Sequence, residues 1–240
     1  MSGAATAVVL DVFGTIVIPP SPSIGLSLAA RSGVPPDDPW SYVIAGGFAA
    51  GVLCHAAGAP FRAVRRVLQT HRFGDAAAAA RAVERLGARS IPLDVVDRFA
   101  QLQAEWVAGY RLAPDADELF ASLDENPRIP RALLSNADNW SGGCIAQFGL
   151  DRRVDWIGLS CDLGAVKPAR VVFETACRAL VVPARNVWMV GDSLTSDIAG
   201  ARSAGLAAIW IDAPDGAPAC DEPRYPLAAV AKIVRRSHAA

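Results

Sequence analysis

The 240-residue sequence predicts an α/β fold in which a doubly wound parallel sheet carries an inserted helical domain. Three observations lead to this prediction. A short apolar run typical of a buried strand lies near the N-terminus, and similar runs alternate with helical stretches after residue 113. Between them, residues 24–112 show helical patterns without a convincing strand. Strands that alternate with helices are typical of parallel sheets with helical crossovers.

The first strand is expected at residues 7–12, where Asp11 interrupts an apolar run near its carboxyl end. A continuous apolar run is typical of a central strand with both faces covered. An Asp there is costly to bury unless it is paired, metal-bound or reactive. Because ligands of open parallel sheets lie beyond the carboxyl ends of strands, Asp11 is a candidate reactive group; a simple turn cap is the alternative. Gly14 permits the sharp turn that follows, and Thr15 adds a hydroxyl group.

The middle of the chain is expected to be a small helical bundle, because apolar residues recur there at helical spacing and prolines separate the pieces. The clearest example runs from residue 94 to 110, where Val95, Phe99, Leu102 and Trp106 share one face. Other helices are expected at residues 23–30, 61–68 and 75–86. Residues 43–59 are broken by glycines, so they are expected to form buried helices and not a membrane span.

The last part of the chain completes the expected sheet. Strands are expected at residues 132–135, 154–160, 187–190 and 207–211, and helices at residues 115–123, 169–180, 196–204 and 227–236. Together with the first strand, these give five parallel strands. Residues 213–226, rich in Pro, Asp and Gly, are expected to be a loop.

Composition excludes several classes of function. The formal net charge of −1 gives no electrostatic case for a nucleic acid or a membrane surface as partner. The five cysteines are odd in number and contain no Cys-x-x-Cys pair, which argues against a zinc site or a disulfide framework; they are Cys54, Cys144, Cys161, Cys177 and Cys220. Reduced thiols and an N-terminus without a signal peptide pattern favour a cytoplasmic protein.

Polar residues follow three of the later strands, as Asp11 follows the first. Ser135 and Asn136 end the second expected strand, Lys167 precedes the helix at 169–180, and the segment Gly191–Asp197 follows the strand at 187–190. Each group alone has an ordinary interpretation as a helix cap, a surface lysine or a turn. Their occurrence in this order on one strand-rich frame is specific.

With these residues, the sequence resembles the haloacid dehalogenase superfamily of hydrolases along its whole length. The resemblance implies a Rossmann-like core of residues 1–16 and 113–240 and a helical cap domain of residues 17–112. The spacing from Gly191 to Gly205 is especially similar to the phosphatase branch. It implies that Asp11 is the nucleophile that forms an aspartyl intermediate, that Ser135 hydrogen-bonds the transferring group, and that Lys167 neutralises its charge.

The resemblance also implies a Mg²⁺ site made by Asp11, the backbone carbonyl of Phe13, and Asp192. Phosphoryl transfer needs positioning and charge neutralisation, and a cation offsets the repulsion between a carboxylate and a phosphate. Asp197 is assigned to orienting Lys167 or a metal-bound water, with a surface helix cap as the alternative. Gly14, Thr15 and Asn136 are expected to contact substrate.

One departure from the family matters. Family phosphatases usually carry an acid/base Asp two residues after the nucleophile, where this chain has Phe13. Loss of a positioned acid/base group typically costs roughly 10²- to 10⁴-fold in rate. Three interpretations stay open: a Mg²⁺-dependent phosphatase whose leaving group needs little protonation, a metal-independent 2-haloacid dehalogenase, and a catalytically silent binding protein. Phosphonoacetaldehyde hydrolysis is excluded by resemblance, because it uses a cap lysine and residues 16–112 contain none.

Specificity in such proteins usually comes from the cap. Basic residues near its centre predict contact with an anionic substrate, with Arg62 and Arg66 as the chosen candidates; a solvated helix face is the alternative. The expected substrate is therefore a small phosphorylated or halogenated molecule. The oligomeric state is left open.

Overall fold

The computed structural model describes residues 7–125, 129–212 and 223–238, and the chain divides into two compact units. The first unit comprises residues 1–18, 112–136 and 145–240, and the second comprises residues 19–111 and 137–144. The chain therefore passes four times from one unit to the other, at residues 18/19, 111/112, 136/137 and 144/145.

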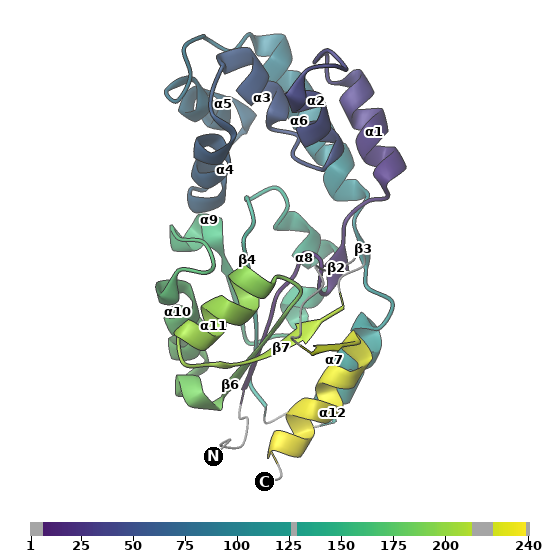
Figure 1. The fold of residues 1–240 in the computed structure, drawn as a ribbon, viewed down its shortest axis with the longest axis vertical. Helices are drawn as coiled ribbons and strands as arrows, with labels where there is room; N and C mark the ends of the chain where they lie inside the picture. The colour runs from purple at the N-terminus through teal and green to yellow at the C-terminus, as the bar shows by residue number, and fades with distance from the viewer. Residues whose placement is uncertain (1–6, 126–128, 213–222, 239–240) are drawn as a thin grey trace. The chain divides into compact units, whose positions relative to one another are not determined.

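A six-stranded parallel sheet forms the centre of the first unit, in the order β5-β4-β1-β6-β7-β8 (Figure 1). Its strands are β1 (Ala7–Leu10), β4 (Arg131–Ser135), β5 (Trp156–Leu159), β6 (Val187–Gly191), β7 (Ala207–Ile211) and β8 (Arg224–Tyr225). The α/β fold and its five expected parallel strands are confirmed. The sixth strand, β8, pairs with β7 and lies in the stretch expected to be loop. Its two residues are exposed, so they carry no buried apolar pattern that would mark a strand.

Strand β1 is central because every one of its side chains is buried, as the apolar run Ala-Val-Val-Leu requires. Ala7 and Val9 share one face with residues of β4 and β6 and with the apolar side of helix α10 (Arg170–Leu180). Alternation along the strand places Val8 and Leu10 on the opposite face. Helices α7 (Ala116–Asp124) and α12 (Leu227–His238) lie side by side in Figure 1.

The remaining helical pieces of the first unit are short. They are α8 (Gly143–Gln147), which begins in the second unit, η1 (Leu150–Arg152), α9 (Ser160–Leu163), η2 (Ala184–Asn186), η3 (Leu194–Ala199) and α11 (Gly200–Ser203). Two expected elements have other bounds in the structure. The strand expected at 154–160 covers Trp156–Leu159. The helix expected at 196–204 begins earlier, with the π-helical segment η3 from Leu194, and ends with α11 at Ser203. The side chain of Ser193 starts that turn by accepting a hydrogen bond from the Ser196 backbone.

The second unit is a helical bundle with its own apolar core. Its helices are α1 (Pro22–Arg31), α2 (Pro39–Ala45), α3 (Gly51–Ala57), α4 (Phe61–Thr70), α5 (Ala76–Glu84) and α6 (Leu93–Ala108). Asp38 and Asp75 cap α2 and α5 by accepting hydrogen bonds from backbone amides. Residues 137–144 join this unit, where Trp140 packs against Phe73 and Phe99.

A short strand precedes the helices of the second unit and another follows them, although no strand was expected at either place. Arg111–Leu112 (β3) pairs with Val17–Ile18 (β2) in a two-stranded sheet, because the two ends of the inserted segment return to the same place. In the described part of the chain, no helix has the length and apolar character needed to cross a membrane. Cys54, Cys144, Cys161 and Cys177 are buried free thiols, and Cys220 lies outside the described residues.

Candidate active site

The carboxyl edge of the sheet brings the expected polar residues together. Asp11 follows β1, Ser135 ends β4, and Asp192 follows β6. Both β4 and β6 are hydrogen-bonded to β1 in parallel, so these three residues lie at adjacent positions of one edge. Asp11 is only 5 % exposed and Ser135 only 2 % exposed, so both lie in a protected site.

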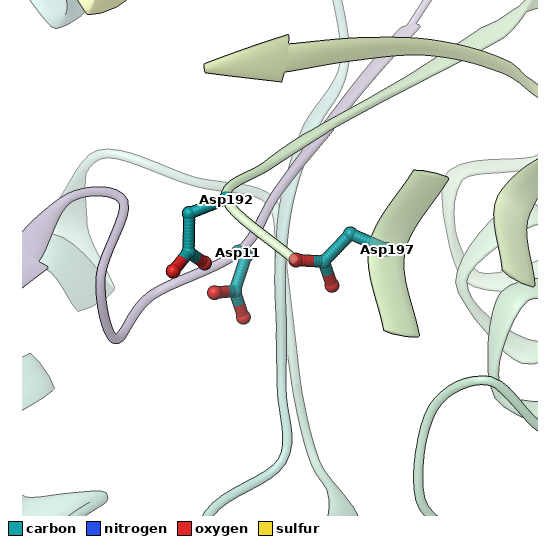
Figure 2. A group of neighbouring side chains, drawn as sticks. All are labelled: Asp11, Asp192 and Asp197. Atoms are coloured by element: carbon teal, nitrogen blue, oxygen red, sulfur yellow. The ribbon is translucent and has the colours of Figure 1, made fainter. Parts of the chain in front are cut away.

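Three carboxylates meet at this edge. Asp11, Asp192 and Asp197 each offer an oxygen, and these oxygens lie within 4.8 Å of one another (Figure 2). Asp197 reaches the group because the π-helical turn η3 returns the chain toward the end of β6. There its Oδ2 accepts a hydrogen bond of 3.0 Å from the Ser193 backbone. Three close negative charges in a buried site create a strong demand for positive charge.

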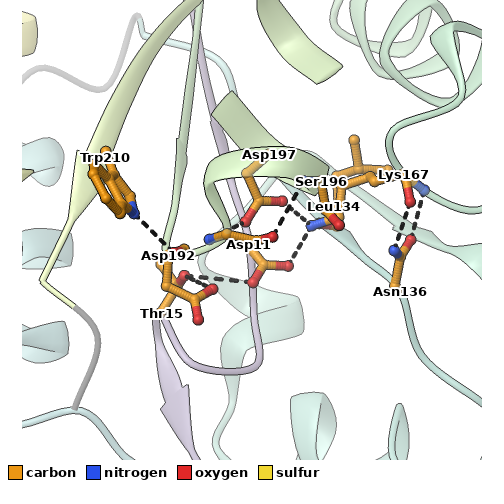
Figure 3. Close-up of polar contacts among 10 residues, drawn as sticks. Asp11, Thr15, Leu134, Asn136, Lys167, Asp192, Ser196, Asp197 and Trp210 are labelled. Carbon is orange, nitrogen blue, oxygen red and sulfur yellow. Dashed lines mark hydrogen bonds and ion pairs between the residues drawn. The ribbon is translucent and has the colours of Figure 1, made fainter. Parts of the chain in front are cut away.

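Lys167 supplies one positive charge. Its Nζ lies 2.5 Å from Asp11 Oδ1 and 2.6 Å from Asp197 Oδ1, and it donates to the carbonyl oxygen of Leu134 at 2.9 Å (Figure 3). Burial alone lowers the pKa of Lys167, but the attraction of Asp11 and Asp197 outweighs it, so the pKa lies above its ordinary value. The amine is therefore a fixed cation beside Asp11.

The side chain of Asn136 holds Lys167 by its backbone. Asn136 Oδ1 accepts a hydrogen bond from the Lys167 amide at 2.7 Å, and Asn136 Nδ2 donates to the Lys167 carbonyl at 2.9 Å. The side-chain amide of Asn136, which was expected to contact substrate, thus forms hydrogen bonds with the backbone of Lys167. Its observed contacts orient the lysine.

The turn after β1 is shaped by Gly14 and Thr15. Gly14 has a φ of +90°, and a Cβ atom there would lie 2.3 Å from Asp192 Oδ2. Only glycine therefore allows the turn to approach the Asp192 carboxylate so closely. The buried Thr15 hydroxyl lies 3.4 Å from Asp11 Oδ2 and 3.3 Å from Asp192 Oδ1, between the two acids.

One positive charge does not balance three carboxylates. Burial, together with repulsion from Asp11 and Asp197, raises the pKa of Asp192 to about 7. Burial and the charge of Asp11 raise the pKa of Asp197 to about 6, although the ion pair with Lys167 opposes the rise. Both shifts show that the folded chain without a bound cation disfavours full ionisation of the cluster.

The donor set fits a hard divalent cation. Such ions prefer carboxylate and carbonyl oxygens, and the oxygens of Asp11 and Asp192 lie close enough together to bind one jointly. The raised pKa of Asp192 also indicates an excess of negative charge that a cation would relieve. Phe13, whose carbonyl is the expected third ligand, pairs with Val17 in an isolated bridge at the start of the turn.

The other expected site residues lie in the second unit. Arg62 and Arg66 are exposed on α4, as is Arg65. His71 and Arg72, which follow α4, are exposed as well.

Two contacts of the site were not expected from the sequence. One is the Leu134 carbonyl, which accepts from Lys167. The other is the Trp210 indole, whose Nε1 donates to the backbone carbonyl of Asp192 at 2.8 Å. Both depend on strand register, which the sequence pattern alone does not specify.

Comparisons with known proteins point to one family. The family model described as haloacid dehalogenase-like hydrolase matches residues 5–205. The chain is 33% identical over 120 residues to a ribulose-1,5-bisphosphate 5-phosphatase from Halopiger xanaduensis, a match that covers 48% of this chain and 50% of the relative. The chain thus spans about half the length, or less, of the curated relatives that it matches.

Two solved structures share the fold over nearly the whole chain. A HAD phosphatase from Thermococcus onnurineus has a TM-score of 0.61 at 19% identity, covering 95% of this chain and 97% of its own. A 2-haloacid dehalogenase from Pseudomonas syringae pv. Tomato has a TM-score of 0.60 at 21% identity, covering 97% and 99%. The same fold therefore carries both chemistries, and the site residues must distinguish them.

Proposed function

The chain belongs to the haloacid dehalogenase-like hydrolases, and we propose that it is a Mg²⁺-dependent phosphatase of a small phosphorylated metabolite. The observation that carries this proposal is the cluster of the buried Asp11 and Asp197 with the partly buried Asp192, and with Lys167 at its side. A metal-assisted phosphoryl site needs this combination of a nucleophile, a cation site and a fixed ammonium group. The name of the Halopiger relative supports a phosphorylated metabolite as the class of substrate.

In the proposed reaction, a carboxylate oxygen of Asp11 forms a bond to phosphorus while the bond from phosphorus to the leaving oxygen breaks. Water then attacks the aspartyl phosphate, inorganic phosphate departs, and the Asp11 carboxylate returns. Lys167 and the Ser135 hydroxyl would hold the phosphoryl oxygens during both steps. A Mg²⁺ ion held by Asp11, Asp192 and the Phe13 carbonyl would supply the charge that offsets repulsion between carboxylate and phosphate.

Phe13 restricts the substrates that such a site can process. Its side chain has no proton to donate, so the departing oxygen must leave without help from this position. Acyl and aryl phosphates meet that condition, because their leaving groups are stable as anions. We therefore propose that the chain favours such phosphate esters or anhydrides over simple alkyl phosphates.

Four of the expected residues are proposed to contact substrate. Gly14 and Thr15 border the acidic cluster, while the exposed Arg62 and Arg66 on α4 offer positive charge to an anionic substrate. For Asn136 we propose the positioning of Lys167, since its amide already bonds that backbone. The buried free thiols of the four described cysteines support a cytoplasmic setting.

A second candidate is a 2-haloacid dehalogenase, which Phe13 favours because family dehalogenases carry an aromatic residue there and halide departs without a proton. Asp192 argues against it, because the resemblance associates a carboxylate at this position with the phosphatase branch.

The two candidates are separated by one set of assays. We expect hydrolysis of p-nitrophenyl phosphate or acetyl phosphate that requires Mg²⁺, is stopped by EDTA, and falls by at least about 10³-fold in Asp11→Asn. A phosphoryl adduct on the peptide carrying Asp11, detected by mass spectrometry after acid quench, would identify the nucleophile. Chloride release from 2-chloropropionate that EDTA leaves unchanged would instead establish the dehalogenase. Absence of turnover with both classes would contradict both and favour a binding protein.

A further inference from the structure

The peptide group that joins Asp192 to Ser193 is held on both sides. Its carbonyl oxygen accepts a hydrogen bond of 2.8 Å from the Trp210 indole Nε1. Its N–H, which belongs to Ser193, donates to Asp197 Oδ2 at 3.0 Å. Figure 3 shows the indole reaching the Asp192 backbone from β7. One peptide plane is thus fixed between an indole and a carboxylate.

Such fixing matters at this position because β6 ends at Gly191, and Asp192 has left the strand. A carbonyl oxygen that is shielded from water and left without a donor is unfavourable, so the indole donor stabilises this path of the chain. The direction of the Asp192 side chain follows from the orientation of its backbone. Fixing the peptide therefore fixes the approach of the Asp192 carboxylate to Asp11 and Thr15.

Trp210 is itself well held. In the register of β6 and β7, Trp210 pairs with Gly191, which directly precedes Asp192, the residue whose carbonyl Trp210 contacts. Its side chain is 1 % exposed, and the Arg224 guanidinium lies over its ring at 5.3 Å from the centroid. Strand register and ring packing therefore leave the indole N–H little freedom to point elsewhere.

We propose that Trp210 is a positioning residue for divalent cation binding, acting through the backbone of Asp192. The proposal rests on the proposed function, because it assumes that Asp192 binds Mg²⁺. Partners that orient metal ligands typically change metal affinity by roughly 10- to 100-fold when removed. Trp210 touches neither cation nor substrate in this role, so its loss affects the affinity for Mg²⁺ more than the chemical step.

The test compares Trp210→Phe with wild type by isothermal titration of Mg²⁺ into the chelator-treated 240-residue chain. We expect the Mg²⁺ dissociation constant to rise by roughly 10- to 100-fold. At saturating Mg²⁺, kcat should return to within about threefold of wild type, because the catalytic groups are intact. Trp156→Phe on β5 is the matched control, since it changes the same atoms at the far side of the sheet and should leave the Mg²⁺ affinity unchanged.

A second variant removes the donor without changing the shape of the ring. Replacing Trp210 by 3-benzothienylalanine substitutes sulfur for the indole N–H and keeps the bicyclic ring, so folding is preserved if Trp210→Phe unfolds. The same rise in the Mg²⁺ dissociation constant, in a variant that still unfolds in one cooperative transition with at most the small loss of melting temperature expected for one hydrogen bond, supports the proposal. If this variant binds Mg²⁺ with the affinity of wild type, the proposed role of Trp210 is overturned, but the proposed metal site is not. Failure of the wild-type protein to bind Mg²⁺ at all would overturn the proposed metal site as well.

Discussion

The side-chain amide of Asn136 brackets the backbone of Lys167, accepting from its N–H at 2.7 Å and donating to its carbonyl at 2.9 Å. Lys167 in turn lies 2.5 Å from Asp11 Oδ1. The residue after the β4 strand end therefore determines where the only described ammonium group in contact with the acidic cluster is placed. Asn139, three positions later, brackets Phe73 of the second unit in the same way, at 3.2 Å and 3.3 Å.

The first prediction uses this pair of asparagines. Asn136→Ala should lower kcat by roughly 10- to 100-fold with little change in KM, because Lys167 loses the contacts that orient it. Each variant removes two hydrogen bonds, so both should lose about 1–2 kcal/mol of the free energy of unfolding. Asn139→Ala should nevertheless keep the kcat of wild type. Steady-state kinetics and urea denaturation measure the two effects. Equal losses of kcat in both variants would refute a specific role for Asn136.

The second prediction concerns pH. The pKa of Asp192 is about 7 in the folded chain without a cation, against 3.8 for an ordinary Asp. Between these values the folded state keeps a proton that the unfolded state has lost, so the free energy of unfolding falls as pH rises through this window. Asp192→Asn removes the penalty, and at pH 8 in EDTA we expect it to be more stable than wild type by about 1–3 kcal/mol.

Urea denaturation at pH 5 and pH 8 checks this expectation. The difference between variant and wild type should shrink at pH 5, where Asp192 is largely protonated. Mg²⁺ at pH 8 should stabilise wild type and have little effect on Asp192→Asn, because the variant lacks a ligand. Parallel stability curves for the two proteins from pH 5 to pH 8 would show that Asp192 is not under electrostatic strain.

The third prediction concerns the approach of Gly14 to Asp192. Gly14→Ala adds a Cβ atom 2.3 Å from Asp192 Oδ2 and places Ala at a φ of +90°. Gly164→Ala is the matched control, because its φ is +69° and nothing lies within 4 Å of the added atom. Both should lose about 1–2 kcal/mol of stability from the backbone. Only Gly14→Ala should also raise the Mg²⁺ dissociation constant, by about tenfold or more, measured by titration calorimetry. An unchanged constant would show that Asp192 tolerates displacement.

The fourth prediction restores the missing acid. Phe13→Asp should raise kcat/KM for an alkyl phosphate by roughly 10- to 100-fold and change acetyl phosphate hydrolysis little, since only the alkoxide leaving group needs a proton. Phe13→Asn controls for the lost aromatic ring, because it has the size of Asp without its acid. Initial rates with both substrates give the comparison. If a folded Phe13→Asp protein gains nothing over Phe13→Asn on the alkyl phosphate, the absent acid does not limit turnover.

Much of the core could be predicted because buried parallel strands leave a strong pattern. The apolar run of β1 and the alternation of later strands with helices indicate the sheet directly. Strand β8 was not predicted because its pairing is local and its side chains are exposed. The π-helical turn was not predicted either, because residues 194–199 carry an ordinary helical pattern and the turn forms around Ser193 and Asp197.

The candidate site shows the same division. Asp11 could be proposed from sequence because a charged group at the end of a buried strand is costly and therefore informative. Lys167, Asp192 and Asp197 could be proposed only through the family resemblance, which their order along the chain supports. Trp210 could not, because an indole in an apolar strand is expected in any core, and its partner is a backbone carbonyl set by register. The contacts of Asn136 could not be predicted, because a side-chain amide at this position can equally well bond the protein backbone or a substrate.

The assignment of residues 137–144 to the second unit bears on how relatives could exchange their variable parts. Because Trp140 packs on Phe73 and Phe99, a chimera that transplants only residues 19–111 would leave a foreign bundle facing an unmatched tryptophan. Residues 19–111 and 137–144 must be transferred together for the core of the chimera to be well packed. Exchange of the second unit between such proteins must therefore include residues 137–144, which a transfer of residues 19–111 alone would omit.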